Sequence, residues 1–238
     1  MVKMISINGL SKVFGNNVAL REINLEVKKG EFIALFGPNG AGKTTLIKIM
    51  STLIAPTSGA VVIDGYNIRD DAIEVRERIG VISHETYLYE DLSARENLQF
   101  YGKMYEVDNL EERISNVISE VGLSPRAEDL VRTFSRGMKQ RLSIARAILH
   151  DPPILLLDEP YTGLDPHAVA TFDRILKVLD ISNKTVVMTT HMISRGIKMS
   201  DRMAILRSGE IAYDVPRVQI QDEEYFKSIY ESYVGEEL

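Results

Sequence analysis

Cysteine is absent from this 238-residue chain, which excludes a disulfide framework and any metal site built on thiolates. Long hydrophobic runs are missing as well. The apolar stretches are only a few residues long, far short of the ~20 that span a bilayer as a helix. The segment Met1–Asn8 lacks the apolar core of a secretory signal. The sequence therefore favours a reducing compartment, and we expect any membrane role to come through a partner.

Positively charged residues are also outnumbered by negatively charged ones. Lys and Arg number 28 against 34 Asp and Glu, which gives a formal net charge of −6. A nucleic-acid backbone attracts clustered Lys and Arg, so the acidic balance argues against nucleic acid as the main partner. Hydrophobic residues at 45 % and charged residues at 26 % are typical of a globular protein. The length suits one large α/β domain with an inserted subdomain.

What the chain does contain is a glycine-rich loop with the pattern G-x-x-x-x-G-K-T. A short apolar run, 31–36, precedes the loop and predicts a buried strand, and apolar residues at helical spacing follow it. A strand, a tight turn and a helix start direct successive backbone N–H groups at the phosphates of a nucleoside triphosphate. We expect Lys43 to reach the β- and γ-phosphates and the Thr44 hydroxyl to bind Mg²⁺. The loop residues predicted to hold the nucleotide are Gly37, Pro38, Asn39, Gly40, Ala41, Gly42, Lys43, Thr44 and Thr45.

Two carboxylates, Asp158 and Glu159, end a second apolar run, Ile154–Leu157. Strand ends line the ligand crevice of parallel sheets, so both acids are expected beside the phosphates. Asp158 is suited to hold Mg²⁺, and Glu159 to activate a water as general base. A third apolar run, Thr185–Thr189, leads to His191, which we expect to contact the γ-phosphate and to position the water. Taken alone, each motif can also be a strand that ends in a solvated turn.

Strand and helix patterns alternate on either side of a helical middle section. Residues 1–30 indicate short strands and turns, and a further strand is predicted at 60–64. Helical periodicity and a capping box at Ser93 predict helices at 94–105, 110–121 and 136–149. Runs on both sides of residues 207–210 predict a hairpin. We expect a single domain 1–238 whose α/β core, residues 1–87 and 151–238, is interrupted by a helical insert, residues 88–150.

Between the phosphate loop and the acid pair, Phe134–Arg141 (FSRGMKQR) resembles the signature motif of ATP-binding-cassette (ABC) ATPases. Gly163–Asp165 is similar to the D-loop of that family, His191 to its switch histidine, and Phe14 to the aromatic residue that stacks on adenine. The resemblance covers essentially the whole chain in the family's order. It implies an α/β fold: the three-layer P-loop NTPase core with an N-terminal antiparallel β subdomain and an inserted α-helical subdomain.

The resemblance also implies that the site is completed by a second ABC ATPase subunit. In the family, the signature of one subunit meets the ATP held by another. Ser135 and Gly137 are therefore expected to bind the nucleotide of a head-to-tail partner, taken here as an identical copy. Their place at a helix start directs N–H groups toward a phosphate. Without the resemblance, residues 134–141 would be interpreted as a solvated basic helix start.

The implied function is that of an ATP-binding and ATP-hydrolysing subunit of an ABC transporter, with ATP and Mg²⁺ as ligands. It would power transport, with export favoured and haem as a candidate cargo, through a separate transmembrane permease at the cytoplasmic face of the cell membrane. Two alternatives stay open: a soluble ABC ATPase outside transport, and a small-molecule phosphotransferase. A single cassette, the missing cysteine and the acidic charge weigh against the first. No acceptor pocket is identified for the second, which leaves the signature unexplained.

Three motifs depart from the commonest family pattern. Arg136 and Met138 replace the first glycine and the glutamine of L-S-G-G-Q. Met192–Gly196 follow the switch histidine where many members have acidic residues, a difference without a functional account. His84 stands at the Q-loop glutamine. Either its imidazole helps to hold the metal and the water, or the position is tolerant and water takes over; both interpretations stay open. In the first case activity falls as pH drops through the histidine range, and a rate flat from about pH 8 to 5.5 would exclude it.

Two further features bear on the branch of the family and on the end of the chain. The His84 loop, Tyr87–Leu98 and the signature together resemble the ATPase subunit of cytochrome c maturation haem exporters, and the broader drug- and polysaccharide-export branch. The segment 222–238 predicts a helix that packs an aromatic stripe on its own core; the alternative is a helix that docks a partner. The stripe consists of Tyr225, Phe226, Ile229, Tyr230 and Tyr233.

Overall fold

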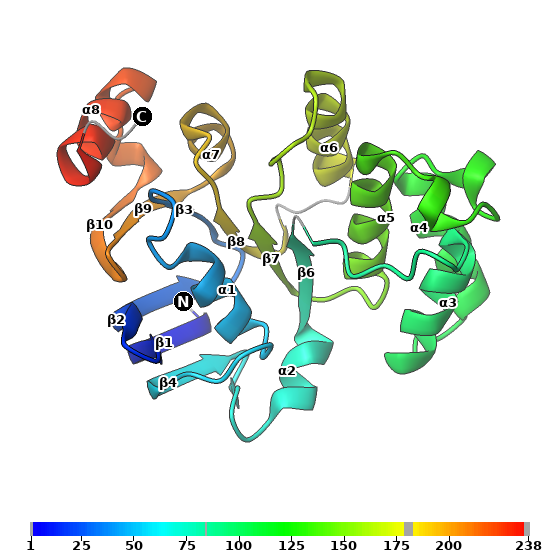
Figure 1. Cartoon of the computed structure of the whole chain (residues 1–238), viewed down its shortest axis with the longest axis horizontal. Coiled ribbons are helices and arrows are strands. Elements are labelled where there is room, and N and C mark those ends of the chain that lie inside the picture. Colours follow the sequence, from blue (N-terminus) through cyan, green and yellow to red (C-terminus); the bar gives the residue numbers. More distant parts are fainter. Residues whose placement is uncertain (1, 84, 179–182, 236–238) are drawn as a thin grey trace.

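The computed structural model describes residues 2–83, 85–178 and 183–235 and contains two β-sheets with helices around them (Figure 1). The first sheet is antiparallel, with the strand order β2-β1-β4-β5. Its strands are β1 (Lys3–Phe14), β2 (Asn17–Lys28), β4 (Ser58–Ile63) and β5 (Tyr66–Asn67). The prediction of short strands in the first 30 residues was wrong, since β1 and β2 have 12 residues each. Several shifts in their register interrupt the alternation of apolar and polar residues that would have revealed long strands.

The second sheet forms the centre of the molecule, with the strand order β10-β9-β3-β8-β7-β6. Strands β9, β3, β8, β7 and β6 run parallel, and β10 pairs antiparallel with β9 as the predicted hairpin. Continuous apolar runs form these strands because both faces of a parallel sheet are covered. The six strands are β3 (Phe32–Phe36), β6 (Ile79–Ser83), β7 (Ile154–Asp158), β8 (Thr185–Thr189), β9 (Arg202–Arg207) and β10 (Glu210–Pro216).

Strand β3 shows how the layers are built, because its side chains alternate between two cores. Ile33 and Leu35 belong to the core that the central sheet shares with the N-terminal sheet and with α1 (Lys43–Met50). Phe32, Ala34 and Phe36 belong to the core on the opposite face, which is covered by helices. The central sheet therefore lies between two apolar layers, as expected for a three-layer α/β protein.

The helical part lies at one end of the molecule (Figure 1). The three predicted helices of this part are present as α3 (Ala94–Met104), α4 (Leu110–Glu120) and α5 (Arg136–Ile148). Ser93 caps α3: its side chain accepts a bond from the Glu96 N–H, and the Glu96 carboxylate accepts one from the Ser93 N–H. The sequence analysis did not predict α2 (Ala72–Arg78), a helix of seven residues.

The rest of the chain returns to the central sheet through α6 (Pro166–Val178) and α7 (Ile193–Met199) and ends with α8 (Glu223–Val234). Phe226 and Tyr230 of α8 are buried in the helix-covered core, which confirms that this helix packs on its own chain. Tyr225 is 40 % exposed, so its assignment to the buried stripe was wrong. Throughout the described ranges, no helix combines the length and the apolar character that a bilayer crossing requires.

Candidate nucleotide site

The phosphate loop connects β3 to α1, and two of its glycines are needed because other backbone segments pass close to them. Gly37 has a φ of +156°, and a Cβ there would lie 2.3 Å from the Leu206 carbonyl oxygen. Gly42 caps α1 with a φ of +105°, and a Cβ there would lie 2.6 Å from the Ala19 carbonyl oxygen. Only glycine fits both positions, so the loop holds its shape through contacts with β2 and β9.

Lys43 is almost fully buried beside this loop. Its Nζ donates hydrogen bonds to the carbonyl oxygens of Gly37 at 2.6 Å and Pro38 at 3.1 Å. The same Nζ lies 3.3 Å from Oε1 of Glu159, whose side chain is 16 % exposed. The structure thus brings together the predicted phosphate ligand and the predicted general base.

Asp158, at the end of β7, accepts two hydrogen bonds from hydroxyl groups. The Thr189 Oγ1 donates to Oδ1 of Asp158 at 2.7 Å and the Thr44 Oγ1 donates to the same atom at 3.2 Å. Strands β7 and β8 are parallel and pair Asp158 with Thr189, which fixes this geometry. Thr44 and Asp158, the two predicted metal ligands, therefore lie side by side.

Glu159 follows with a φ of +48°, an uncommon conformation for a residue with a side chain. Its N–H donates to the Thr189 carbonyl oxygen at 3.1 Å and to the Thr189 Oγ1 at 3.0 Å. Its Oε2 lies 2.7 Å from Nδ1 of His191, which is more than half exposed. The two carboxylate oxygens of Glu159 are thus held by Lys43 on one side and by His191 on the other.

Thr189 is a site residue that the sequence analysis did not identify. Its hydroxyl accepts from the Glu159 backbone N–H and donates to the Asp158 carboxylate, so one side chain contacts both acidic residues. The signal in the sequence was a Thr at the end of an apolar run that predicts a buried strand; the structure buries Thr189 fully, and a buried hydroxyl needs partners. That signal alone does not name the partners.

The C-terminal helix also reaches the site. Burial, with the Glu159 carboxylate nearby, raises the pKa of Tyr230. The Phe226 ring packs against Phe36, the residue that precedes the phosphate loop, at 4.8 Å between centroids. On α7, a Cβ at Gly196 would lie 2.2 Å from the Phe36 ring. Helices α7 and α8 therefore support the strand end from which the loop departs.

A cavity of about 360 Å³ lies over the phosphate loop. The loop from Pro38 to Thr45 lines it, together with Phe14 and Glu159. Phe14 is 48 % exposed, and the Lys12 Nζ lies 4.7 Å from the centroid of its ring. An exposed aromatic face at the rim of a polar cavity is suited to stack on a flat ring.

Ser135 and Gly137 do not line this cavity. Ser135 caps α5, where its hydroxyl accepts from the Met138 N–H at 3.3 Å. Both residues line a second cavity of about 340 Å³, which shares no lining residue with the first. Within one chain, the signature and the phosphate loop are therefore separate. His84 lies outside the described residues, and its role stays a prediction.

The oxygen ligands that the site offers suit a cation that keeps part of its hydration shell. Among residues 2–83, 85–178 and 183–235, no group of three or more His, Cys, Asp and Glu residues could hold a metal ion. Thr44 and Asp158 offer one hydroxyl and one carboxylate. Mg²⁺ binds through one or two carboxylates together with phosphate oxygens and water, which fits this pair.

Comparisons with known proteins agree with this geometry. The sequence model of the family described as ABC transporter matches residues 20–162. The linearmycin resistance ATP-binding protein LnrL of Bacillus subtilis is 37 % identical over 87 % of this chain and 68 % of that protein. Nod factor export ATP-binding protein I of Cupriavidus metallidurans is 34 % identical over 100 % of this chain and 79 % of that protein.

A solved structure shares the fold. It is an ATP-binding cassette in a dimeric post-hydrolysis state bound to ADP and Pi, and it is 30 % identical to this chain. The TM-score is 0.80, and the match covers 90 % of this chain and 99 % of that one.

Proposed function

Because the chain belongs to the ABC transporter family, as an ATP-binding domain, we propose that it hydrolyses ATP to power a membrane transporter that exports its substrate. One observation carries this proposal. Lys43, Asp158, Glu159 and His191 meet at the carboxyl edge of the central sheet, next to a loop whose backbone is shaped for phosphates. Such an edge is where ligands bind in open α/β sheets.

Each side chain has a role in the proposed reaction. Lys43 binds the β- and γ-phosphates, and Thr44 and Asp158 hold Mg²⁺, which offsets phosphate charge when bound. Glu159 accepts the proton of the attacking water, and its carboxylate is oriented by contact with Lys43 and His191. His191 lies within hydrogen-bond distance of this base and positions the water and the γ-phosphate. Phe14 stacks on the adenine ring.

We also propose a head-to-tail homodimer. The separation of Ser135 and Gly137 from the phosphate loop supports it, because each would then complete the site of a second copy. The dimeric cassette described above is consistent with such an assembly. Closure on two ATP molecules and reopening after hydrolysis would supply the motion that drives transport.

An exposed apolar patch, mostly aromatic, supports docking to a membrane subunit. It comprises Tyr87, Tyr89, Phe100 and Met104, each between 39 % and 62 % exposed, and the Tyr89 and Phe100 rings lie 4.9 Å apart. Exposed apolar patches of this kind mark interaction sites. We propose that residues 88–150 form a helical subdomain that carries most of the patch, and that docking holds the chain at the cytoplasmic face of the membrane.

For the cargo, the proposal covers the direction of transport, which is export. The relatives named for linearmycin resistance and Nod factor export support this direction. The resemblance to haem-exporter ATPases stays a prediction from the sequence, because no relative reported above carries it.

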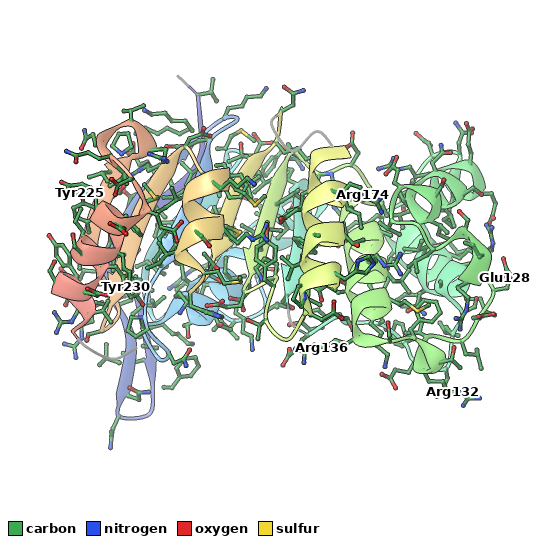
Figure 2. All side chains as sticks on the ribbon, turned by 90° about the horizontal axis from the view of Figure 1, so that it is seen from above. Glu128, Arg132, Arg136, Arg174, Tyr225 and Tyr230 are labelled. Carbon is green, nitrogen blue, oxygen red and sulfur yellow. The ribbon has the colours of Figure 1, made fainter. Side chains whose placement is uncertain are left out.

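Replacing Glu159 by Gln tests the hydrolytic proposal. The variant keeps the shape of the side chain but cannot take the water's proton, so we expect ATP binding with turnover reduced at least ~100-fold. It should also accumulate as an ATP-dependent dimer in size-exclusion chromatography. Glu128→Gln is the matched control, because this exposed residue lies at the far end of the helical part (Figure 2). Wild-type turnover in Glu159→Gln would refute the assignment of the base.

Affinity purification from detergent-solubilised membranes tests the transport proposal. We expect a membrane protein to co-purify, and Tyr89→Ser with Phe100→Ser to lose it while ATP turnover in solution is kept. Recovery of ribosomes or DNA without any membrane protein would instead establish a non-transport ABC ATPase.

A further inference from the structure

An ion pair joins the helix that follows His191 to the helix that follows Glu159. These helices, α7 and α6, cover the same face of the central sheet (Figure 1). Arg195 of α7 pairs with Asp173 of α6, with Nη1 directed at Oδ2. The two side chains are 30 % and 21 % exposed, so water and salt screen this pair less than a pair on the open surface. Arg195 belongs to residues 192–196, which had no functional account from the sequence, and the structure provides it with a partner.

The Tyr161 hydroxyl connects this ion pair to the loop that carries the proposed general base. It donates to Oδ1 of Asp173 at 2.9 Å and lies 3.0 Å from Sδ of Met199 on α7. Tyr161 is buried, and its ring packs edge-on against Phe172 at 5.1 Å between centroids. Burial, together with the Asp173 carboxylate, raises the pKa of Tyr161, so the hydroxyl stays protonated and available as a donor. The helices α6 and α7 therefore meet at one side chain of the loop.

The backbone of Tyr161 lies between two turns of residues 159–165. The Thr162 N–H donates to the Glu159 carbonyl oxygen, and the Leu164 N–H donates to the Tyr161 carbonyl oxygen, both at 3.1 Å. Glu159 has a positive φ, a conformation that persists only where the surrounding structure holds it. An anchored Tyr161, two residues further along the chain, provides such a restraint on the base.

The loop and α7 are thus joined by two links. In the first, Nδ1 of His191 lies 2.7 Å from Oε2 of Glu159. In the second, Arg195 reaches Tyr161 through Asp173. Both links start close together on the loop and close together near the start of α7, so they form a short closed ring. A change in the second link is therefore transmitted to the first over a short path.

We propose that Arg195 is a positioning residue for ATP hydrolysis, which acts through Asp173 and Tyr161 to hold Glu159 in contact with His191. This role rests on the proposed hydrolysis of ATP, in which Glu159 is the base. Arg195 is not among the residues that line the cavity over the phosphate loop, so its effect falls on the base and not on nucleotide binding.

Steady-state ATP turnover by the full-length chain tests the proposal. We expect Arg195→Gln to lower kcat about tenfold and to change the KM for ATP less than about twofold, because a small misplacement of a catalytic group slows the chemical step. Arg195→Lys keeps the charge and should recover part of the loss. Lys198→Gln is the matched control, because it removes the same charge from an exposed position on α7. Urea titration of each variant verifies that the fold is kept.

A double variant tests the path through Tyr161. Tyr161→Phe removes the hydroxyl but keeps the ring against Phe172, and we expect kcat to fall by about the same factor as in Arg195→Gln. If both residues act through one network, the double variant is no slower than either single variant, since the effects of coupled residues do not add.

Hydrogen exchange provides a measurement that does not depend on activity. In the chain without nucleotide, we expect the backbone amides of residues 159–165 to exchange faster in Arg195→Gln than in Lys198→Gln, because the loop has lost an anchor. Amides of the distant helix α3 should exchange equally in the two variants.

Three outcomes would overturn the positioning role. One is equal kcat in Arg195→Gln and Lys198→Gln. Another is a double variant whose loss is the product of the two single losses. The third is equal exchange of residues 159–165 in Arg195→Gln and Lys198→Gln. Normal turnover of the wild-type chain alongside any of these results would leave the hydrolytic proposal intact. A wild-type chain without ATP turnover would instead overturn the proposed hydrolysis, and the exchange comparison would still show whether Arg195 anchors the loop.

Discussion

Acid should destabilise this fold through one histidine, His150. Its ring stacks on Tyr105 with 4.0 Å between centroids and an angle of 7°, and its Nε2 lies 3.1 Å from the Ile79 carbonyl oxygen. Its Nδ1 is buried without a hydrogen-bond partner. Burial lowers the pKa of His150 from 6.5 to about 4; the bond to Ile79 acts against this shift, and the charge of Arg146 adds to it.

The sign of this pH effect on stability follows from which state, folded or unfolded, binds the proton more readily. The unfolded chain takes up a proton on His150 near pH 6.5, and the folded chain does so only near pH 4. Between these values the unfolded state binds more protons, so the free energy of unfolding falls as the pH falls. The pKa difference corresponds to a loss of about 3 kcal/mol once the pH is below 4, and about 2 kcal/mol of it is lost by pH 5.

Urea unfolding at pH 8 and pH 5 measures this contribution, with the wild type compared with His150→Phe. Phenylalanine keeps the stacking on Tyr105 and cannot be protonated. Between the two pH values we expect the wild type to lose about 2 kcal/mol more than the variant. The chain has 4 histidines, and the other three are present in both proteins, so their contributions cancel in the difference. Equal losses in the two proteins would refute the reasoning.

Three further outcomes are expected. Gly42→Ala should abolish ATP binding and lower the free energy of unfolding by ~2 kcal/mol or more, because the added Cβ would clash with backbone atoms. Gly40→Ala is the control: the space around its Cβ is open, so only the ~1 kcal/mol strain of its positive φ is expected. Thr189→Val should reduce turnover roughly tenfold to a hundredfold, since the Asp158 carboxylate and the Glu159 backbone N–H each lose the Thr189 hydroxyl as a partner. Thr185→Val at the other end of the same strand should cost stability without this loss. Phe14→Ala should raise the KM for ATP about fivefold with kcat unchanged, as a stacking contribution of ~1 kcal/mol would give; steady-state kinetics and urea titrations check all three.

Local patterns predicted those parts of the site whose functional residues are neighbours in the sequence. The phosphate loop needs its glycines and its lysine next to each other in sequence, and Asp158 and Glu159 are neighbours at a strand end, so both motifs could be recognised directly. The helices α3, α4 and α5 were predicted within one or two residues because caps and apolar spacing are local signals.

The contacts that the sequence did not reveal are made between distant segments. The pairing of Thr189 with Asp158 depends on the register of two strands about 30 residues apart, which no local pattern encodes. The approach of Tyr230 to Glu159 depends on how α8 folds back onto α7. The lengths of β1 and β2 were missed for a different reason, since irregular register obscures the two-residue period on which strand prediction depends.

The strand order of the central sheet also determines when, during synthesis, the nucleotide site can form. Strand β3 carries the phosphate loop, but its sheet neighbours β8 and β9 come from residues 185–189 and 202–207. After the ribosome has made the loop, most of the chain must still emerge before β3 gains either neighbour. Until then its apolar run has no sheet to join, and chaperones are its natural protection. ATP-agarose should therefore retain only nascent chains that have been extended past β9.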